Sequence, residues 1–481
     1  MKYYDQLIFD FSKDGRIGYA LRKNEFSDVA LPKHLLRDAK AELPEVSELD
    51  VVRHFTNVSQ KNFGIENGFY PLGSCTMKYN PKTNDALAML PGFSDIHPLQ
   101  PAHTTQGLLK IYYETQNMLA EISGLHAYSL NTFAGAHGEL AGLMIIKAYH
   151  EKNNDHKRNK IIIPDSAHGT NPASATVCGF ETVEIKSNLD GTVNLEALKA
   201  ALSDEIAGLM LTNPNTAGAF EKDILEVSKL VHEAGGLLYY DGANLNALLG
   251  KAKPGDMGFD ITHINLHKTF STPHGGGGPG SGPVGVCEML KDFLPNPIIK
   301  EKDGVYFIDY SEDSIGYLGG FYGNASVYIR AYVYLLTYGR SHLSNIGPYA
   351  VLNANYIKES LKDVFELPID GHCMHEFVFD GLKDKSTGVK TLDIAKRLLD
   401  YGVHAPTIYF PLIFSQALMI EPTEGESKET LDHFISVMRT VVKEALETPE
   451  LVKSAPHTTI VRRLDEVKAV KHPILKFKDI A

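Results

Sequence analysis

The sequence lacks several features that would assign it to a specialised class. Its four cysteines, Cys75, Cys178, Cys287 and Cys373, form no CxxC pair, so we expect neither a metal site nor a disulfide framework. Isolated thiols in a chain of this size favour a reducing compartment. Acidic residues soon interrupt the N-terminal segment, which is unlike a secretory signal peptide. These absences together predict a cytoplasmic protein.

Positive charge and long apolar runs are also scarce. The formal net charge of −12 argues against nucleic acid as the main partner, because binding phosphates requires a basic surface. No apolar run reaches the roughly 18 residues that would predict a membrane span. The chain has 481 residues, of which 43% are hydrophobic and 22% charged. This composition is ordinary for a globular protein, and the length favours two domains plus an arm.

The apolar pattern changes twice along the chain. Residues 1–105 are rich in Pro, Gly and Asn and predict an N-terminal arm, with short helical patterns at Leu35–Ala41 and Val46–Val58. Residues 106–345 alternate short apolar runs with helical periods, which is typical of a large, mostly parallel sheet covered on both faces. Residues 346–481 predict a smaller C-terminal α/β domain with a tail. The expected fold class is therefore α/β.

The large domain is predicted element by element. The expected strands are Ile161–Ile163, Thr182–Ile185, Ile206–Leu211, Leu237–Tyr240, Ile261–Leu266 and Pro283–Cys287. The expected helices are Leu195–Leu202, Ile224–Ala234 and Val327–Tyr338. Each candidate site segment described next follows one of these strands or opens a helix.

The strongest local pattern surrounds one lysine. An apolar run ending at Leu266 is followed at once by His267 and Lys268, and then by a glycine-rich stretch that includes Gly275–Gly278. Ligands of open α/β sheets bind beyond the carboxyl ends of strands, and a lysine held there can form an imine. Glycines let the backbone approach such a ligand closely. Lys268 is therefore the candidate catalytic lysine, although a surface lysine before a flexible turn gives a similar pattern.

A second strand-like run, Leu237–Tyr240, ends in Asp241 and continues through Ala243 to Asn244. The pyridine nitrogen of pyridoxal 5'-phosphate (PLP) requires a carboxylate that keeps it protonated and makes the ring an electron sink. Asp241 precedes Lys268 by 27 residues, which leaves room for one crossover between neighbouring strands. We therefore expect Asp241 and Ala243 at the cofactor. An aspartate that merely caps a turn is the alternative.

A small, glycine-rich loop leads into a third candidate segment. Ala136, His137 and Gly138 are expected at the start of a helix, where backbone amides and the helix dipole favour a phosphate. The loop matches neither the GxGxxG fingerprint nor the P-loop. A simple helix cap would look the same, so this segment is weak evidence by itself.

Two further segments follow predicted strands. His168, after Ile161–Ile163, is placed to stack on the outer face of a pyridine ring, although a lone histidine is more often structural. Asn213 and Thr216 follow Leu211 and offer donors for the cofactor's phenolic oxygen or for substrate, although a Pro-Asn turn explains them equally well. Taken in chain order, the five segments offer a phosphate cradle, a stacking histidine, a polar loop, a carboxylate and a lysine. That ordered set favours a PLP site.

Other readings of the same residues remain open. An aminotransferase or amino-acid decarboxylase of the same fold would usually need an arginine for the substrate α-carboxylate, and Arg330, Arg340 and Arg397 are candidates without a predicted position. A cofactor-free structural subunit is also possible in principle, but the intact lysine segment argues against it. The region around Ser74, Cys75 and Lys78 is irregular yet aromatic, and we expect it to reach an active site.

Several longer motifs resemble glycine decarboxylase, the P-protein of the glycine cleavage system. They are Asn265-Leu-His-Lys-Thr-Phe270 with the glycine run that follows, Ala134–Glu139, Ala167–Ser174, Asp241–Asn244, Tyr70–Lys78 and Met419–Thr423. The lysine segment is highly specific to that family, and the resemblance covers residues 60–450. It implies the PLP-dependent transferase fold of type I, which is like that of aspartate aminotransferase.

The resemblance also implies an activity and roles for individual residues. The activity is decarboxylation of glycine with transfer of the aminomethyl group to the lipoyl arm of H-protein, and the cofactor is PLP. Lys268 would be the Schiff-base lysine, His168 the ring-stacking group and Asp241 the partner of the pyridine nitrogen. His137 is a departure, because the family's loop is expected to carry glutamine there. The chain matches the lysine-bearing half of single-chain members, which implies subunit 2 of a two-subunit form and a partner, subunit 1, in an α2β2 heterotetramer.

Overall fold

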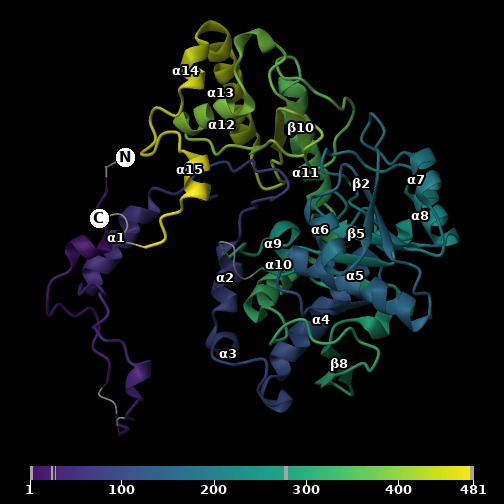
Figure 1. Cartoon of the computed structure of the whole chain (residues 1–481), viewed down its shortest axis with the longest axis horizontal. Coiled ribbons are helices and arrows are strands. Elements are labelled where there is room, and N and C mark those ends of the chain that lie inside the picture. Colours follow the sequence, from purple (N-terminus) through teal and green to yellow (C-terminus); the bar gives the residue numbers. More distant parts are fainter. Residues whose placement is uncertain (1–3, 23–24, 28, 276–279, 477–481) are drawn as a thin grey trace. The chain divides into compact units, whose positions relative to one another are not determined.

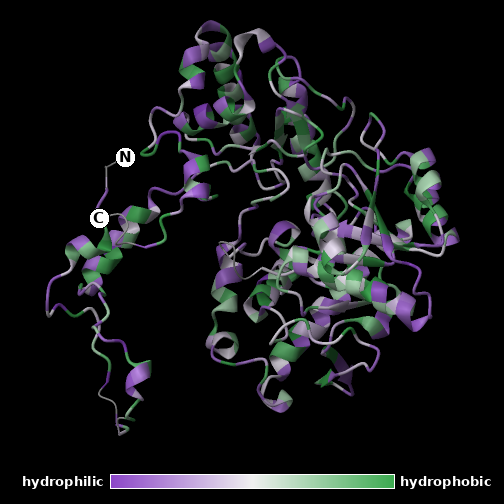
Figure 2. Cartoon of the chain, viewed as in Figure 1, coloured by the Kyte–Doolittle hydropathy of each residue, from purple (hydrophilic) through white to green (hydrophobic). Residues whose placement is uncertain are grey.

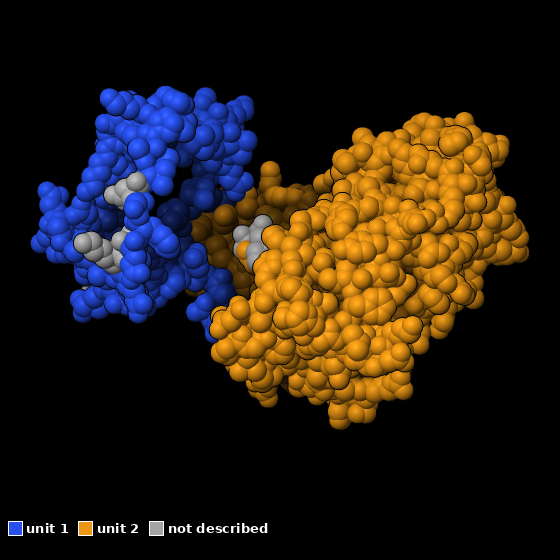
Figure 3. All heavy atoms as spheres, turned by 90° about the horizontal axis from the view of Figure 1, so that it is seen from below, with its two compact units in different colours: residues 1–67, 458–481 blue, residues 68–457 orange. Residues whose placement is uncertain are grey.

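The computed structural model describes residues 4–22, 25–27, 29–275 and 280–476. Most of the predicted glycine run at 275–278 therefore lies outside the described residues. The chain divides into two compact units, residues 1–67 with 458–481, and residues 68–457 (Figure 3). The division predicted at residues 105 and 345 stays a prediction. Among the described residues, no helix has the length and apolarity needed to cross a membrane.

The first unit contains one longer helix, α1 (Glu48–Ser59). Ser47 caps it by accepting a hydrogen bond from the Asp50 amide, which stabilises a helix start. The predicted helix at Val46–Val58 is confirmed to within two residues. The predicted helical pattern at Leu35–Ala41 is wrong: that stretch is exposed and holds only the end of a 3-10 turn, because a short helix without packing is marginal in water. The unit's other elements are η1 (Ile8–Phe11), η2 (Lys33–Leu35) and α15 (Glu466–Lys471).

The second unit is built on a seven-stranded sheet with the order β1-β7-β6-β5-β4-β2-β3 (Figure 1). Its strands are β1 (Ala127–Ser129), β2 (Lys160–Pro164), β3 (Glu181–Ile185), β4 (Ile206–Leu211), β5 (Leu237–Gly242), β6 (Ile261–Ile264) and β7 (Val284–Val286). Strands β2 to β6 run parallel, and β7 pairs antiparallel with both β1 and β6. The prediction of a mostly parallel sheet is confirmed.

The predicted strands are confirmed with small changes at their ends. The run expected at Ile261–Leu266 was too long, because β6 stops at Ile264 and Leu266 already begins the short helix α9 (Leu266–Thr269). Strand β1 was not predicted, since three residues give no readable alternation. Alternate residues of β4 and β5 belong to separate clusters on the two sheet faces: Leu209 and Tyr240 to one, Met210 and Tyr239 to the other. Burial on both faces explains why these strands are continuously apolar.

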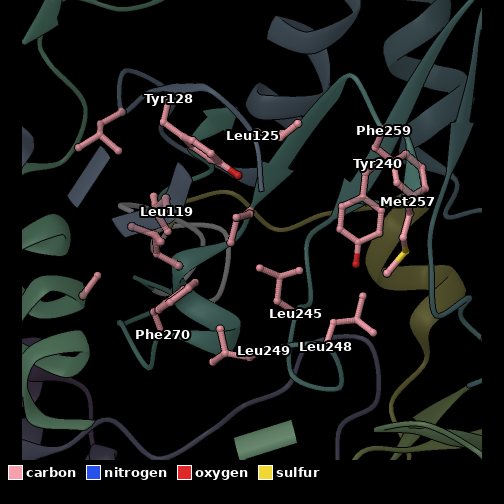
Figure 4. Packing of buried hydrophobic residues seen from close by; sticks show 14 of the residues in the cluster. Leu119, Leu125, Tyr128, Tyr240, Leu245, Leu248, Leu249, Met257, Phe259 and Phe270 are labelled. Carbon is pink, nitrogen blue, oxygen red and sulfur yellow. The ribbon is translucent and has the colours of Figure 1, made fainter. Parts of the chain in front are cut away.

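Helices cover both faces of this sheet (Figure 1). They are α4 (Gln106–Ser123), α5 (Gly135–Lys152), α6 (Thr170–Val177), α7 (Leu195–Ala201), α8 (Ile224–Glu233) and α10 (Ala325–Leu343). Side chains of α4, α8 and α10 pack in one cluster, and those of α5 and α6 in the other. Figure 4 shows part of the first cluster, in which the rings of Tyr240 and Phe259 lie 4.9 Å apart. The three predicted helices are found as α7, α8 and α10.

A second, smaller sheet has the order β10-β12-β11 and is antiparallel. Its strands are β10 (Phe377–Asp380), β11 (Thr407–Ile408) and β12 (Ala417–Ile420), and its helices are α11 (Ile346–Leu361), α12 (Thr391–Asp400), α13 (Lys428–Glu447) and α14 (Pro449–Lys453). These helices alternate apolar and polar segments in Figure 2, as expected when one face is buried. Leu431, Phe434 and Val441 of α13 pack with Phe377 and Leu418 of the sheet.

The remaining elements are short. They are α2 (Lys82–Ala88), α3 (Pro91–Ser94), the hairpin β8 (Ile298–Lys302) and β9 (Val305–Asp309), and the 3-10 turns η3 (Ala102–Thr104), η4 (Pro254–Met257), η5 (Glu288–Phe293) and η6 (Lys385–Thr387). Residues 70–78 take an irregular path beside the small sheet, where Leu72 forms an isolated bridge with Ile420. This path brings the region around Ser74 next to the carboxyl ends of the large sheet's strands.

Candidate active site

A cavity of about 170 Å³ lies at the carboxyl ends of the parallel strands. Residues from seven separate parts of the chain line it, and Lys268, Asp241 and His168 are among them. Position follows from topology: β5 and β6 are neighbours, so the residues that end one strand and follow the other meet at the same edge. The structure therefore brings together the three residues predicted to act in catalysis.

Lys268 lies in the single turn of α9, directly after β6. Its backbone amide donates to the Asn265 carbonyl at 3.0 Å, so the turn that follows the strand fixes where the lysine side chain begins. The positive charge of Lys268 contributes to lowering the pKa of His168 and His375, for which burial is the larger cause. Lys268 thus exerts an electrostatic effect on two histidines that line its own cavity.

Asp241 is a buried carboxylate held by three neighbours. Its Oδ2 accepts from Asn171 Nδ2 at 3.0 Å and its Oδ1 accepts from the Ala243 amide at 3.1 Å. His263 Nε2 lies 3.5 Å from Oδ1. Burial opposes ionisation, but His263, the Asn171 hydrogen bond and Lys268 together hold the pKa of Asp241 below its ordinary value. The group is therefore an anion, which is what a protonated pyridine nitrogen needs opposite it.

His168 is fixed by a short hydrogen-bonded chain that begins at Glu139. Glu139 Oε1 accepts from Thr170 Oγ1 at 2.7 Å, and the same hydroxyl lies 2.7 Å from His168 Nδ1. Burial, with a smaller contribution from Asp241, raises the pKa of Glu139 to about 7. Burial lowers the pKa of His168, so its ring is neutral at pH 7 and suited to stacking. Glu139 lines the cavity, although the sequence suggested only a first-turn helix residue.

The start of helix α5 also borders the cavity, through Gly135 and Ala136. Amides in the first turn of a helix have no intrahelical acceptor, so this edge offers N–H donors to an anion. His137 and Gly138 are not among the lining residues. The His137 ring instead stacks on Phe133 at 5.8 Å, and its Nδ1 accepts from the Phe133 amide at 3.2 Å. That local role explains how histidine is accommodated where glutamine was expected.

Some of the other predicted site residues line the cavity, and the rest do not. Thr216 and Ala243 line the cavity. Asn213 does not. Its Oδ1 accepts from the Glu221 amide at 2.9 Å and its carbonyl accepts from Tyr240 at 2.7 Å, so it stabilises the loop between β4 and α8. His267 is also outside the lining and lies edge-on to His274 at 4.7 Å.

Two buried polar atoms without hydrogen-bond partners and one glycine indicate that a polar ligand the size of PLP fits this cavity. Thr212 Oγ1 and Asn265 Oδ1 are buried without a hydrogen-bond partner among the described residues, and both residues line the cavity. A Cβ on Gly135 would lie 2.4 Å from Asn265 Oδ1, so only glycine leaves this approach to the helix start open. Buried polar atoms normally have partners, and the donor set of amides, carboxylate and lysine suits PLP.

Sequence reasoning missed two lining residues that lie far from Lys268 in the sequence, His375 and Glu376. His375 and Glu376 precede β10, and both line the cavity together with Ser74. Glu421 follows β12 nearby and accepts from Thr76. Ser74 was expected to reach the site, and Glu421 lies within the Met419–Thr423 motif. The sequence did not single out His375 and Glu376, because polar residues commonly precede an apolar strand.

Comparisons with known proteins decide the family. The model of the glycine cleavage system P-protein matches residues 16–303, and that of the glycine dehydrogenase C-terminal domain matches residues 347–461. The chain belongs to the glycine cleavage system P-protein family. The predicted resemblance is thus confirmed, and with it the activity class of a glycine decarboxylase whose family depends on PLP. The family assignment favours glycine decarboxylase over the alternatives of an aminotransferase or another amino-acid decarboxylase.

Relatives in this family share the chain's length. It is 61% identical over 482 residues to a probable glycine dehydrogenase (decarboxylating) subunit 2 of Caldanaerobacter subterraneus subsp. tengcongensis, covering 99% of each chain. It is 60% identical to the protein of the same name from Alkaliphilus oremlandii, again over 99% of each. The name subunit 2 implies that a further subunit completes the enzyme, as the sequence predicted.

Solved structures confirm the fold class. A crystal structure of glycine decarboxylase (P-protein) in inhibitor-bound form has a TM-score of 0.72 and 20% identity, over 85% of this chain and 93% of that one. A cysteine desulfurase from Escherichia coli has a TM-score of 0.61 and 15% identity, over 82% of this chain and 98% of that one. At this identity the likeness establishes the type I fold of PLP-dependent enzymes and nothing finer.

Proposed function

We propose that this P-protein chain binds PLP in the cavity at Lys268 and uses it to decarboxylate glycine. Lys268 would hold the cofactor covalently, Asp241 would keep its pyridine nitrogen protonated, His168 would stack on its ring, and the amides at the start of α5 near Ala136 would hold its phosphate. The observation that carries the proposal is the meeting of Lys268 and Asp241 in one cavity, at the ends of neighbouring strands. His137, Gly138, Asn213 and His267 support this arrangement from outside the lining.

Bound PLP supplies an electron sink for the electron pair that remains when CO2 leaves glycine. The chain's own residues make that sink effective. Asp241, whose pKa is lowered by His263, the Asn171 hydrogen bond and Lys268, would hold a proton on the cofactor's nitrogen. Thr170 fixes the His168 ring and so limits where the cofactor ring can lie. Asp241 and Asn171 are buried, and the low local dielectric strengthens the contact between them.

The cavity also favours glycine over substrates that need an arginine clamp. None of the three candidate arginines lines it. Arg330 pairs with Asp85 at 2.6 Å, Arg397 pairs with Glu444 at 2.8 Å, and Arg340 pairs with Glu121. We infer that the substrate carboxylate is held by neutral donors instead, which lowers the cost of losing it as CO2.

We infer two macromolecular partners for the same reaction. The aminomethyl group passes to the lipoyl arm of H-protein, and a glycine dehydrogenase subunit 1 joins this chain in an α2β2 heterotetramer. The family assignment and the subunit 2 name of the relatives support both. Co-expression with the companion subunit, followed by mass measurement in solution, should give a particle with two copies of each chain. A particle that contains only this chain would contradict the assembly.

The cofactor assignment has a direct spectroscopic test. The protein mixed with PLP should gain an absorbance band at the boundary of the visible and ultraviolet, and borohydride should trap the label on Lys268, as read by peptide mapping. Lys268→Ala should abolish both the trapped label and release of labelled CO2 from carboxyl-labelled glycine. Lys229→Ala, which changes an exposed lysine on α8, is the matched control. Labelling elsewhere, or full activity of Lys268→Ala, would refute the assignment.

A further inference from the structure

Two buried carboxyl groups face each other beside the cavity. Glu376 directly precedes β10 and Glu421 directly follows β12. The antiparallel register pairs Phe377 with Ile420, so Glu376 and Glu421 occupy the next opposed positions at the same end of the small sheet. A carboxylate oxygen of each and a ring nitrogen of His375 all lie within 4.8 Å of one another. Like charges directly opposite each other on paired strands are destabilising.

Hydrogen-bond donors are unequally shared between the two carboxyls. Glu421 Oε1 accepts from Asn244 at 2.8 Å, Thr76 at 3.0 Å and Asn246 at 3.2 Å. Among the described residues, Glu376 is given one donor, the Ser74 amide, which reaches Oε2 at 2.8 Å. Donors stabilise the ionised form of a carboxyl group. The arrangement therefore places the negative charge on Glu421 and leaves Glu376 as the partner that carries a proton.

Electrostatics agree with this division. Burial, reinforced by the charge of Glu421, raises the pKa of Glu376 to about 8. Burial also raises the pKa of Glu421, but there the Asn244 and Thr76 hydrogen bonds and the charges of Lys268 and Lys78 oppose it. His375 cannot neutralise the pair, because burial lowers its pKa to about 3. Several charged and titratable groups interact electrostatically with Glu376. They are Lys268 of α9, Glu421 after β12, Cys75 of the irregular segment, and Cys373 and His375 before β10.

The irregular segment at 70–78 builds this site at a cost in backbone strain. Ser74, Thr76 and Met77 have φ angles of 67°, 69° and 45°, which non-glycine residues rarely adopt. The strained turns aim the Ser74 amide at Glu376 and the Thr76 hydroxyl at Glu421. Strain of this kind persists where the surrounding structure enforces it, and it clusters at functional sites. Glu376 lines the cavity with Lys268, whereas Glu421 lies behind it.

The proposed reaction takes up one proton for each glycine consumed. The electron pair left by CO2 forms a carbon–sulfur bond to one sulfur of the lipoyl disulfide, and the sulfur–sulfur bond breaks. The second sulfur leaves as a thiolate and becomes a thiol when it gains a proton, so the disulfide is reduced while the glycine carbon is oxidised. A neutral acid at the cavity wall is the group that this step requires.

We propose that Glu376 and Glu421 share a single proton and that Glu376 donates it to the sulfur released from the acceptor disulfide. The inference rests on the proposed function and assigns its proton donor. Solvent reprotonates Glu376 after product leaves. Glu139 is a poorer candidate, because its two oxygens already accept from Thr170 and Ser174.

A pH profile of the complete system tests the proposal. Because the acid must be protonated, kcat of the wild type should be constant below the pKa of Glu376 and fall as the pH rises through about 8. Glu376→Gln should lower kcat by about 100-fold and lose that alkaline limb. Glu421→Gln removes the neighbouring charge and should move the limb to lower pH. Glu376→Ala should regain activity with added acetate or formate. Glu221→Gln, a buried glutamate outside the cavity, is the control.

A second measurement does not depend on turnover. Infrared difference spectra of the full chain at pH 7, wild type minus Glu376→Gln, should contain the carbonyl band of a protonated carboxylic acid. The inference would be overturned if that band were absent. It would also be overturned if Glu376→Gln kept the alkaline limb of wild type or a kcat within threefold of wild type. Tight Zn²⁺ binding that depends on Glu376 would overturn it as well. If the wild type fails to trap PLP on Lys268, the proposed function fails instead, which separates the two results.

Discussion

Replacing Asp241 with asparagine tests the electrostatic core of the site. Asparagine keeps the size of the side chain but removes the charge and one of the two acceptors that Asn171 and the Ala243 amide use. In the proposed function the lost charge is the one that faces the pyridine nitrogen, and the Asp241 side chain is buried. Losing one such preorganised contact costs about 3 kcal/mol of transition-state stabilisation, which corresponds to a fall in kcat/KM of about 150-fold.

The assay is release of labelled CO2 from carboxyl-labelled glycine, with lipoylated acceptor protein and the companion subunit present. Asp204→Asn is a suitable control, because Asp204 makes an exposed ion pair with Lys157 at 2.7 Å. Thermal unfolding of both variants separates loss of catalysis from loss of folded protein. A rate for Asp241→Asn within threefold of wild type, in a normally folded protein that has bound PLP, would refute the role given to Asp241.

Two further changes test the supports of the site. Thr170→Val removes the hydroxyl that links Glu139 to His168, and the loss of about 1 to 1.5 kcal/mol should lower kcat/KM by roughly tenfold. An unaltered kcat/KM would show that His168 needs no such anchor. Phe434→Ala opens a cavity in the core of the small sheet, where Phe434 packs on Phe69 at 5.0 Å, and should lower the free energy of unfolding by about 3 to 5 kcal/mol. Urea denaturation measures this, and a loss below 1 kcal/mol would contradict the packing argument.

The large sheet could be predicted well from the sequence because its strands are buried on both faces. Runs such as Ile206–Leu211 are continuously apolar and end sharply, and the observed β4 has the same bounds. The catalytic candidates followed from that, since Asp241 and Lys268 stand directly after two such runs. The order of the strand-end segments favoured a PLP site, and the family's motifs then added glycine as the substrate, which neither periodicity nor spacing could supply.

The parts that escaped prediction depend on long-range pairing. Glu376 and Glu421 are 45 positions apart in the sequence and meet only because β10 and β12 pair antiparallel. The sharp turns at Ser74 and Thr76 leave no signature either, since neither residue is one that favours positive φ. His137 was overvalued for the opposite reason: its position at a helix start was predicted well, but its side chain serves Phe133 rather than the cavity.

Two buried carboxyl groups with opposite protonation states therefore line one cavity beside Lys268. Asp241 accepts from Asn171 and Ala243 and lies near His263, which keeps it ionised in spite of burial. Glu376 accepts from a single amide and faces another carboxylate, which keeps it protonated. Pairs of titratable groups whose surroundings push their pKa values apart divide the acid and base roles of an active site. If the proposals hold, this division leaves an anion where the electron sink would need one and a proton where the acceptor sulfur would need one.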